Sequence, residues 1–393
     1  DDYFNGWYVY ITDYANIAVE RQVSDYATTT GTLTVRGASL SSDGANLATI
    51  WVSRRPVVMT IDKAINRAIE ELYPALHQRI DDTTLITGNE LPDASFEWWT
   101  SATAMQFYST SNATLAQTTT AGLYRGQRGT TSMKVTASSA GGYSYISSDS
   151  YPRLLDLMGE TVDAYVWAAP QTANDSTMVI YTVKADGTAQ TLTSTTAAPA
   201  GEFTQLALEN QGINDDLVEI QVRFRVATSG QYCYFDDAYL NGRTLTEYLL
   251  PKRLQGGHID RAMLQLSGDA SPAAYDLHAT YWGDLDFKII DDGTYRYLYQ
   301  DNTPADGYRI RLIGTAPLDT LSSATGTINI DAGGRTDLLV VYAGYLMYEM
   351  TESPASAEDR SRLEAETAKR YGKYRRLLNI HRMGTPAGRL KVP

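Results

Sequence analysis

Residues that could carry catalysis are scattered along this 393-residue chain. Its four histidines lie far apart and lack metal-ligand spacing. Adjacent carboxylates on a strand point to opposite faces, so an Asp-Asp pair cannot flank one glycosidic bond. The phosphate-loop, Gly-x-Ser-x-Gly and His-Glu-x-x-His motifs are absent from the sequence. We therefore expect a protein that is not an enzyme. The acidic pairs are Asp81-Asp82, Asp215-Asp216, Asp236-Asp237 and Asp291-Asp292.

Charge and cysteine content narrow the remaining function classes. The net charge of −13 argues against a general nucleic-acid-binding surface and against an anionic-membrane surface. The single cysteine, Cys233, excludes an intramolecular disulfide framework and is expected to be a small buried residue. Tyrosine outnumbers phenylalanine 28 to 7, which favours half-exposed sheets and subunit interfaces. The composition thus indicates a binding or assembly protein.

Three segments have helical patterns. Residues 60–73 carry one apolar stripe, residues 335–350 are apolar on nearly every face, and residues 356–380 run from acidic to basic. An apolar pattern of that kind predicts that residues 335–350 are buried all round. We expect these helices to pack together as one small helical core, with inserted β structure between them. The predicted fold class is α+β and mainly β.

The β-rich sequence divides into modules by composition. Short strands and the first helix occupy residues 1–88, although the polar stretch 81–91 is predicted to be a linker. Residues 89–241 are rich in Ser, Thr, Ala and Gly, and their strands of six to nine residues indicate an antiparallel sandwich. A second β-rich module follows at 242–334, with an Asp-Gly turn at 291–293 that predicts a hairpin. The C-terminal helices at 335–381 and an extended tail at 382–393 complete the chain.

The two ends of the sandwich segment carry a recognisable pair of motifs. An "N…FE" strand at Asn89 to Glu97 opens it, and a "Y-hydrophobic-Asp-Asp-hydrophobic" strand at Tyr234 to Ala238 closes it. This pair resembles the jelly-roll carbohydrate-binding modules of polysaccharide-degrading enzymes and phage structural proteins. The resemblance implies a structural calcium held by Glu97 and Asp237, since that ion takes hard oxygen ligands. The alternative is that backbone donors satisfy both carboxylates. No other cofactor is expected.

Sugar binding needs exposed flat rings, because pyranose faces stack on them. Most aromatic residues of the segment are expected to lie in the core or at interfaces. Tyr143 and Tyr145 are the best pair, since their alternation with Ser144 points both rings to one face. The sugar-platform candidates are Trp98, Trp99, Tyr124, Tyr143 and Tyr145, to which Tyr151 and Trp167 are added as further exposed-ring candidates.

The C-terminal segments of the chain carry a second resemblance to a known family. A "P-x-x-G-Y-R" strand entry at 304–309, an apolar helix, a Tyr/Lys/Arg-rich helix and a "P…R…V-P" tail look like head-to-tail connector (neck or adaptor) proteins of tailed bacteriophages. That likeness implies a virion protein at the neck, assembled in the host cytoplasm as a homo-oligomeric ring with twelve-fold symmetry. Its implied partners are the portal protein and the tail or neck proteins, and the jelly roll would meet a surface glycan or its own neighbours.

The C-terminal end supplies the candidates for portal or neighbour docking. From Lys369 to Lys391 the chain has basic residues and no acidic residue. The alternative is a solvated helix end and a disordered tail. A different class of function also stays open, that of a secreted or tail-tip carbohydrate-binding protein in which the jelly roll is the working part. The docking candidates are Arg375, Arg376, Arg382, Arg389, Lys391 and Pro393.

Overall fold

The computed structural model describes most of the chain and divides it into two compact units. One unit contains Asp1–Arg79 and Thr315–Pro393, and the other contains Ile80–Gly314. The residues described are 3–12, 16, 19–42, 48–53, 58–125, 129–194, 199–266, 282–301, 305–321, 328, 330, 335–349 and 357–381.

The first unit begins with a small antiparallel sheet. Its strands are β1 (Tyr8–Ile11), β2 (Glu20–Ala27), β3 (Thr32–Val35) and β4 (Ile50–Ser53), in the order β3-β2-β1-β4. Val9 and Ile11 pair with Val52 and Ile50 across β1 and β4, which aligns apolar side chains on one face. The predicted short strands near the N-terminus are therefore confirmed.

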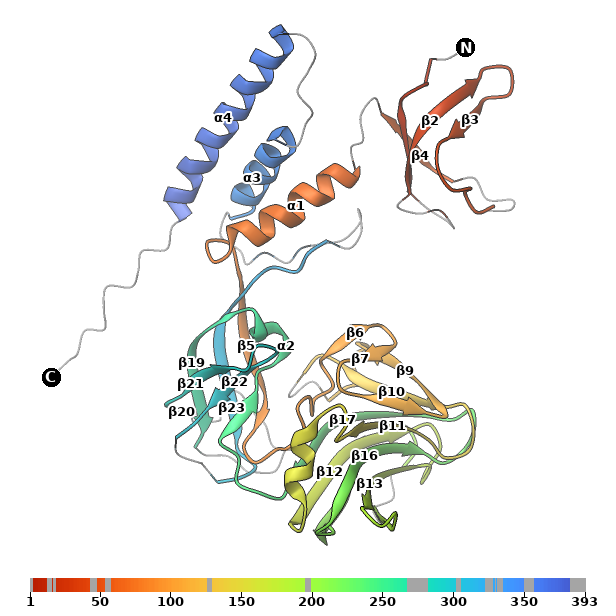
Figure 1. The fold of residues 1–393 in the computed structure, drawn as a ribbon, viewed down its shortest axis with the longest axis vertical. Coiled ribbons are helices and arrows are strands. Elements are labelled where there is room, and N and C mark those ends of the chain that lie inside the picture. The colour runs from red at the N-terminus through yellow and green to blue at the C-terminus, as the bar shows by residue number, and fades with distance from the viewer. Residues whose placement is uncertain are drawn as a thin grey trace, which may run out of the picture. The chain divides into compact units, whose positions relative to one another are not determined.

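Three longer helices follow the predicted positions (Figure 1): α1 (Val58–Leu72), α3 (Thr336–Glu349) and α4 (Ala357–His381). Ala68 and Ile69 of α1 share a buried apolar cluster with Leu338 and Leu346 of α3, and Leu378 of α4 packs against that cluster. The expectation that these segments pack together across about 250 residues of sequence is thus confirmed. Nothing in this packing is specific to a phage adaptor.

The prediction that residues 335–350 are buried on every face is wrong. Val340 of α3 is 63% exposed, while Leu338 and Leu346 are fully buried. The helix contacts α1 and α4, and these two neighbours leave the Val340 side uncovered. None of the described helices is both long and apolar enough to cross a membrane.

The second unit is built on an antiparallel sandwich of two five-stranded sheets, as predicted for a jelly roll. We call them the β16 sheet, ordered β14-β13-β16-β11-β8, and the β17 sheet, ordered β15-β12-β17-β10-β9. Their strands are β8 (Ser109–Ser111), β9 (Ala113–Thr118), β10 (Ser132–Ala137), β11 (Gly142–Ser147), β12 (Thr161–Pro170), β13 (Ser176–Lys184), β14 (Ala189–Thr193), β15 (Thr204–Gly212), β16 (Leu217–Val226) and β17 (Tyr232–Asn241).

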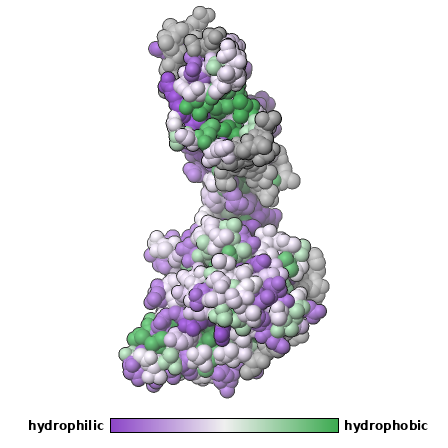
Figure 2. All heavy atoms as spheres, turned by 90° about the vertical axis from the view of Figure 1, so that its right-hand side faces the viewer, coloured by the Kyte–Doolittle hydropathy of each residue, from purple (hydrophilic) through white to green (hydrophobic). Residues whose placement is uncertain are grey.

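Strand alternation fills the space between these two sheets. Ile180 and Phe224 of the β16 sheet and Met133 and Phe235 of the β17 sheet are fully buried in one apolar cluster. Cys233 lies in the same cluster, which confirms the expected small buried residue. Intervening residues of each strand face outward, so each sheet has one outer face. Figure 2 shows a surface on which hydrophilic and neutral residues predominate.

Two smaller sheets complete this unit. One has the order β18-β22-β21, and the other has the order β20-β19-β23-β5. The remaining elements are β5 (Gln78–Ile86), β6 (Trp99–Ser101), β7 (Ala104–Met105), the 3-10 helix η2 (Pro152–Leu157), β18 (Glu247–Leu249), α2 (Lys252–Gln255), β19 (His258–Gln265), β20 (Trp282–Asp284), β21 (Lys288–Asp291), β22 (Arg296–Tyr299) and β23 (Arg309–Ala316). The antiparallel pairing of Asp291 with Arg296 confirms the predicted hairpin.

The predicted linker at 81–91 is wrong in its first half, because residues 78–86 form strand β5 beside β23. Its polar side chains have partners in the fold. Asp81 accepts a hydrogen bond of 2.7 Å from Arg311 of β23, and Asp82 accepts bonds from the backbone and hydroxyl of Thr84. The polar residues of this segment are therefore strand residues with hydrogen-bond partners, and they do not form a solvent-exposed linker.

Candidate functional site

The predicted tyrosine pair lies on the outer face of the β16 sheet. Ser144 and Ile146 of β11 are fully buried. Tyr143 and Tyr145, which alternate with them along the strand, point to the opposite side and are partly exposed. The two ring centroids are 5.6 Å apart with an interplanar angle of 61°. The alternation thus points both rings to one face, as the sequence predicted.

Strand β16 brings an arginine to these rings. In the antiparallel register Tyr145 is opposite Arg223, and Val179 of β13 is opposite Arg223 on its other side. The Arg223 guanidinium carbon lies 4.7 Å from the centre of the Tyr143 ring and 3.7 Å from that of Tyr181. A planar cation placed against two aromatic faces has few alternative rotamers. The strands therefore fix a ring, cation, ring arrangement across β11, β16 and β13.

A polar chain along β16 orients this arginine. Arg223 Nε donates a 2.7 Å hydrogen bond to Gln221, and the Gln221 amide donates in turn to Glu219. Glu219, Gln221 and Arg223 follow one another at intervals of two residues along β16, so all three side chains lie on its outer face. Sequence reasoning missed Arg223 and Tyr181, although the alternating Val222-Arg223-Phe224-Arg225 run carried the signal that both arginines face outward.

The other predicted platform residues do not join this face. Trp99 is only 5% exposed, and its indole nitrogen donates a 2.7 Å hydrogen bond to Phe96, which makes it a core residue. Trp98 is partly buried, with its ring edge-to-face at 5.3 Å from Phe107 and 5.7 Å from Tyr295. Tyr124 is partly buried in the segment between β9 and β10. Trp99 is thus buried in the core and Trp98 packs against it, so neither belongs to the outer face of the β16 sheet.

The predicted calcium ligands already have partners within the chain. One oxygen of Glu97 accepts backbone hydrogen bonds of 2.6 Å from Thr130 and 2.8 Å from Thr131. The carboxylate of Asp237 lies 3.6 Å from the Arg125 guanidinium. Within the described part of the chain no group of three or more His, Cys, Asp or Glu residues is placed to hold a metal. The observed bonds of Glu97 match the alternative in which backbone donors satisfy it, and the calcium site stays a prediction.

Carboxyl groups are nevertheless concentrated around the middle of β17. Burial is the main cause that raises the pKa of Asp236 well above its ordinary value, and the carboxylates of Asp237 and Glu97 add to the rise. Burial likewise raises the pKa of Glu97, against the lowering effect of its backbone donors. The backbone N–H of Arg125 opposes the rise in the pKa of Asp236, because it donates a 2.7 Å hydrogen bond to that carboxylate.

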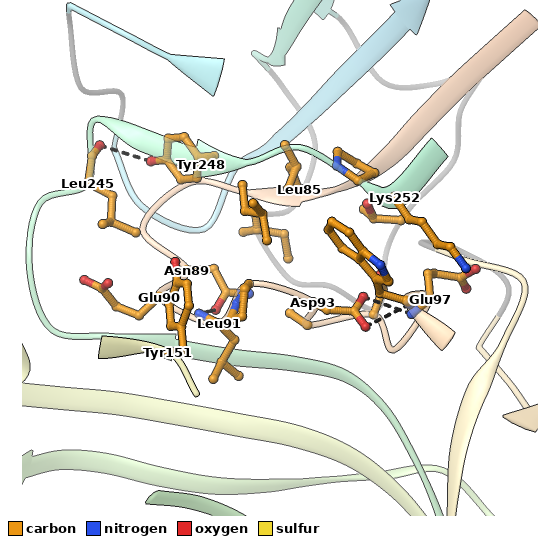
Figure 3. Close-up of a pocket in the computed structure, with 18 of the residues that line it drawn as sticks. Leu85, Asn89, Glu90, Leu91, Asp93, Glu97, Tyr151, Leu245, Tyr248 and Lys252 are labelled. Atoms are coloured by element: carbon orange, nitrogen blue, oxygen red, sulfur yellow. Dashed lines mark hydrogen bonds between the residues drawn. The ribbon is translucent and has the colours of Figure 1, made fainter. Parts of the chain in front are cut away.

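A small cavity lies between the opening segment of the sandwich and residues 245–252 (Figure 3). Asp93 accepts 2.9 Å hydrogen bonds there from the backbone nitrogens of Glu97 and Trp98. Glu90 accepts a 2.9 Å bond from Arg243. Burial outweighs these bonds and raises the pKa of each carboxyl to about 7. The cavity measures about 40 Å³, so it has room for a few water molecules and none for a sugar ring.

The predicted docking residues fall at the C-terminus of the chain. Arg375 and Arg376 are exposed on α4. Their role in docking stays a prediction. Arg382, Arg389, Lys391 and Pro393 lie outside the described residues.

Comparisons with known proteins give similarity to solved structures only. No family model matches the chain, and no curated protein matches it. A family 22 carbohydrate-binding module of Clostridium thermocellum Xyn10B is 18% identical, with a TM-score of 0.32, over 39% of this chain and 93% of that one. A xylan-binding CBM22-1 domain from Paenibacillus barcinonensis Xyn10C is 14% identical, with a TM-score of 0.31, over 43% of this chain and 99% of that one. Tailspike protein 4 of bacteriophage CBA120 is 12% identical, with a TM-score of 0.29, over 40% of this chain and 22% of that one.

Proposed function

We propose that this chain is a carbohydrate-binding protein that binds a polysaccharide on the outer face of its β16 sheet, without catalysis. The observation that carries the proposal is the ring, cation, ring arrangement of Tyr143, Arg223 and Tyr181, with Tyr145 beside it. We call these four residues the aromatic platform.

The chemistry of the platform suits a sugar chain. Tyrosine rings offer apolar faces for the C–H side of a pyranose, and their hydroxyls and the guanidinium offer donors for its oxygens. The platform sits on strands whose register is fixed by the buried core, so little ordering is needed on binding. An extended polysaccharide can follow a sheet face more easily than it can enter the 40 Å³ cavity.

Affinity electrophoresis in gels that contain xylan or polygalacturonate tests this proposal. We expect the double variant Tyr143→Ala/Tyr145→Ala to lose at least about tenfold in affinity for the polysaccharide that retards the wild-type protein. Tyr232→Ala is the matched control, because Tyr232 is also partly exposed on a sheet face and also contacts a cation, Lys134 at 4.0 Å, but lies on the β17 sheet. Equal retardation of the double variant and wild type would overturn the proposal.

The connector role rests on the sequence likeness alone. The three helices are present and pack together, but helix packing of this kind occurs in many proteins. The portal and tail partners, the twelve-fold ring and the neck location in a virion therefore stay predictions. The glycan-binding proposal does not depend on them, since the platform lies within the 80–314 unit.

A further inference from the structure

The strands of the two sheets differ in their content of basic and acidic residues. The strands of the β16 sheet contain three basic residues, Lys184, Arg223 and Arg225, and one acidic residue, Glu219. The strands of the β17 sheet contain one basic residue and four acidic ones, namely Lys134 against Asp163, Glu209, Asp236 and Asp237. In a chain of net charge −13, a basic sheet is a local exception.

The arginines of this basic sheet lie at the aromatic platform. Arg225 is opposite Tyr143, as Arg223 is opposite Tyr145, so both cations share the outer face with the rings. Arg225 is exposed, and neither arginine forms an ion pair with any residue that the structure describes. The one carboxylate on these strands, Glu219, is hydrogen-bonded to Gln221. Two guanidiniums beside the rings thus keep their charge available to a ligand.

A glycine gives Arg225 its place on this face. Gly141, just before β11, has a φ of +73°, and a Cβ there would lie 3.0 Å from Arg225 Nη2. The arginine side chain therefore lies close over the backbone at this position, next to Tyr143 on β11. Its guanidinium thus lies near the start of β11, whose Tyr143 is the register partner of Arg225.

We infer that the ligand is an anionic polysaccharide, whose carboxylate or sulfate groups bind Arg225 and Arg223 while its rings stack on the tyrosines. This inference rests on the proposed function and specifies its ligand. Guanidinium binds both oxyanions through paired, charge-assisted hydrogen bonds, so the site itself accepts either group. In an acidic protein, attraction at this one face would also direct such a ligand away from the β17 sheet.

Binding to four soluble polysaccharides tests the inference with the full chain. Polygalacturonate is compared with its neutral methyl ester, and dextran sulfate is compared with neutral dextran, by isothermal titration at 50 and 500 mM NaCl. We expect at least one anionic form to bind about tenfold more tightly than its neutral counterpart, and to weaken at high salt. The pair that shows the difference identifies carboxylate or sulfate as the group bound.

Two variants distinguish the preference for an anionic ligand from polysaccharide binding as such. Arg225→Gln should remove most of the preference for the anionic form over its neutral counterpart. Lys134→Gln is the matched control, since it removes a cation that lies over tyrosines of the opposite sheet. Equal wild-type affinity for the charged and neutral members of both pairs would overturn the inference and leave glycan binding intact. If none of the four polysaccharides binds, the inference fails, and the proposed function fails as well if xylan does not retard the protein either.

Discussion

Side chains of the sandwich divide by their exposure into those that are buried in its core and those that lie on an outer face. Trp99 and Tyr143 were both platform candidates in the sequence, yet Trp99 is 5% exposed and Tyr143 is partly exposed on a sheet face. Strand alternation predicts the orientation of Tyr143. No local pattern reveals that Trp99 folds back to bond the carbonyl of Phe96.

The buried carboxyls at the cavity make stability depend on pH. The pKa of Asp93 and of Glu90 is about 7 in the folded protein, against about 4 in an unfolded chain. Between pH 4 and pH 7 the folded state therefore binds protons that the unfolded chain has released. The stabilising contribution of these two groups is therefore fully present below about pH 4 and is lost as the pH rises through about 7.

We therefore expect the melting temperature of the 80–314 unit to fall by roughly 5 °C between pH 5 and pH 8. Scanning calorimetry at both pH values measures the difference. In Asp93→Asn the difference should shrink, because that side chain no longer titrates. A melting temperature that rises with pH over this range in the wild-type protein would contradict the assignment of raised pKa values.

At the scale of elements, strand β11 approaches the neighbouring backbone so closely at one position that only glycine fits there. A Cβ at Gly142, the first residue of β11, would lie 2.1 Å from the backbone oxygen of Asn112. Backbone cannot move aside as a flexible side chain can. The pairing of β11 with β8 therefore requires glycine at this position.

Gly142→Ala should lower the free energy of unfolding by about 3 kcal/mol, because it forces β11 away from its neighbour. Urea denaturation measures the loss. The matched control is Gly212→Ala at the end of β15, where an added Cβ meets nothing within 4 Å and the change should stay within about 0.5 kcal/mol. Similar effects of the two substitutions would show that the approach of β8 to β11 is looser than described.

Element prediction from the sequence succeeded where a pattern was long and regular. The apolar stripe at 60–73 corresponds to α1, and the alternating run at 217–226 forms β16. The pattern failed at β5, where a polar run was taken for a linker. This segment forms a strand beside β23, whose Arg311 is 230 residues away in sequence and donates a hydrogen bond to Asp81. Long-range pairing of that kind leaves no local signal, and for the same reason the contact of Arg223 with Tyr181 was not predicted.

At the scale of the whole molecule, the sandwich and the second β module belong to one compact unit. Leu249 of β18 and Tyr297 of β22 are buried in the same apolar cluster as the sandwich core. Lys252 also donates a hydrogen bond of 2.5 Å to the carbonyl of Trp99. The segment 89–241, which the sequence delimits as a module, thus lacks side chains that complete its own core.

We expect residues 78–316, which include all of β5 and β23, to fold as an isolated fragment with one cooperative unfolding transition. The shorter fragment 89–241 should be less stable by several kcal/mol or fail to fold, because it exposes apolar surface that Leu249 and Tyr297 cover. Thermal unfolding followed by circular dichroism compares the two. Equal stability of both fragments would mean that the second module adds nothing to the sandwich core.

The central claim is that a polysaccharide lies on the outer face of the β16 sheet, and hydroxyl-radical footprinting read by mass spectrometry tests it most directly. The full chain is oxidised alone and with the polysaccharide that binds it most tightly. Our account predicts that oxidation of Tyr143 and Tyr145 falls several-fold on binding, while oxidation of Tyr232 and Tyr234 on the β17 sheet is unchanged. Protection of Tyr232 and Tyr234 with Tyr143 and Tyr145 still fully reactive would contradict it.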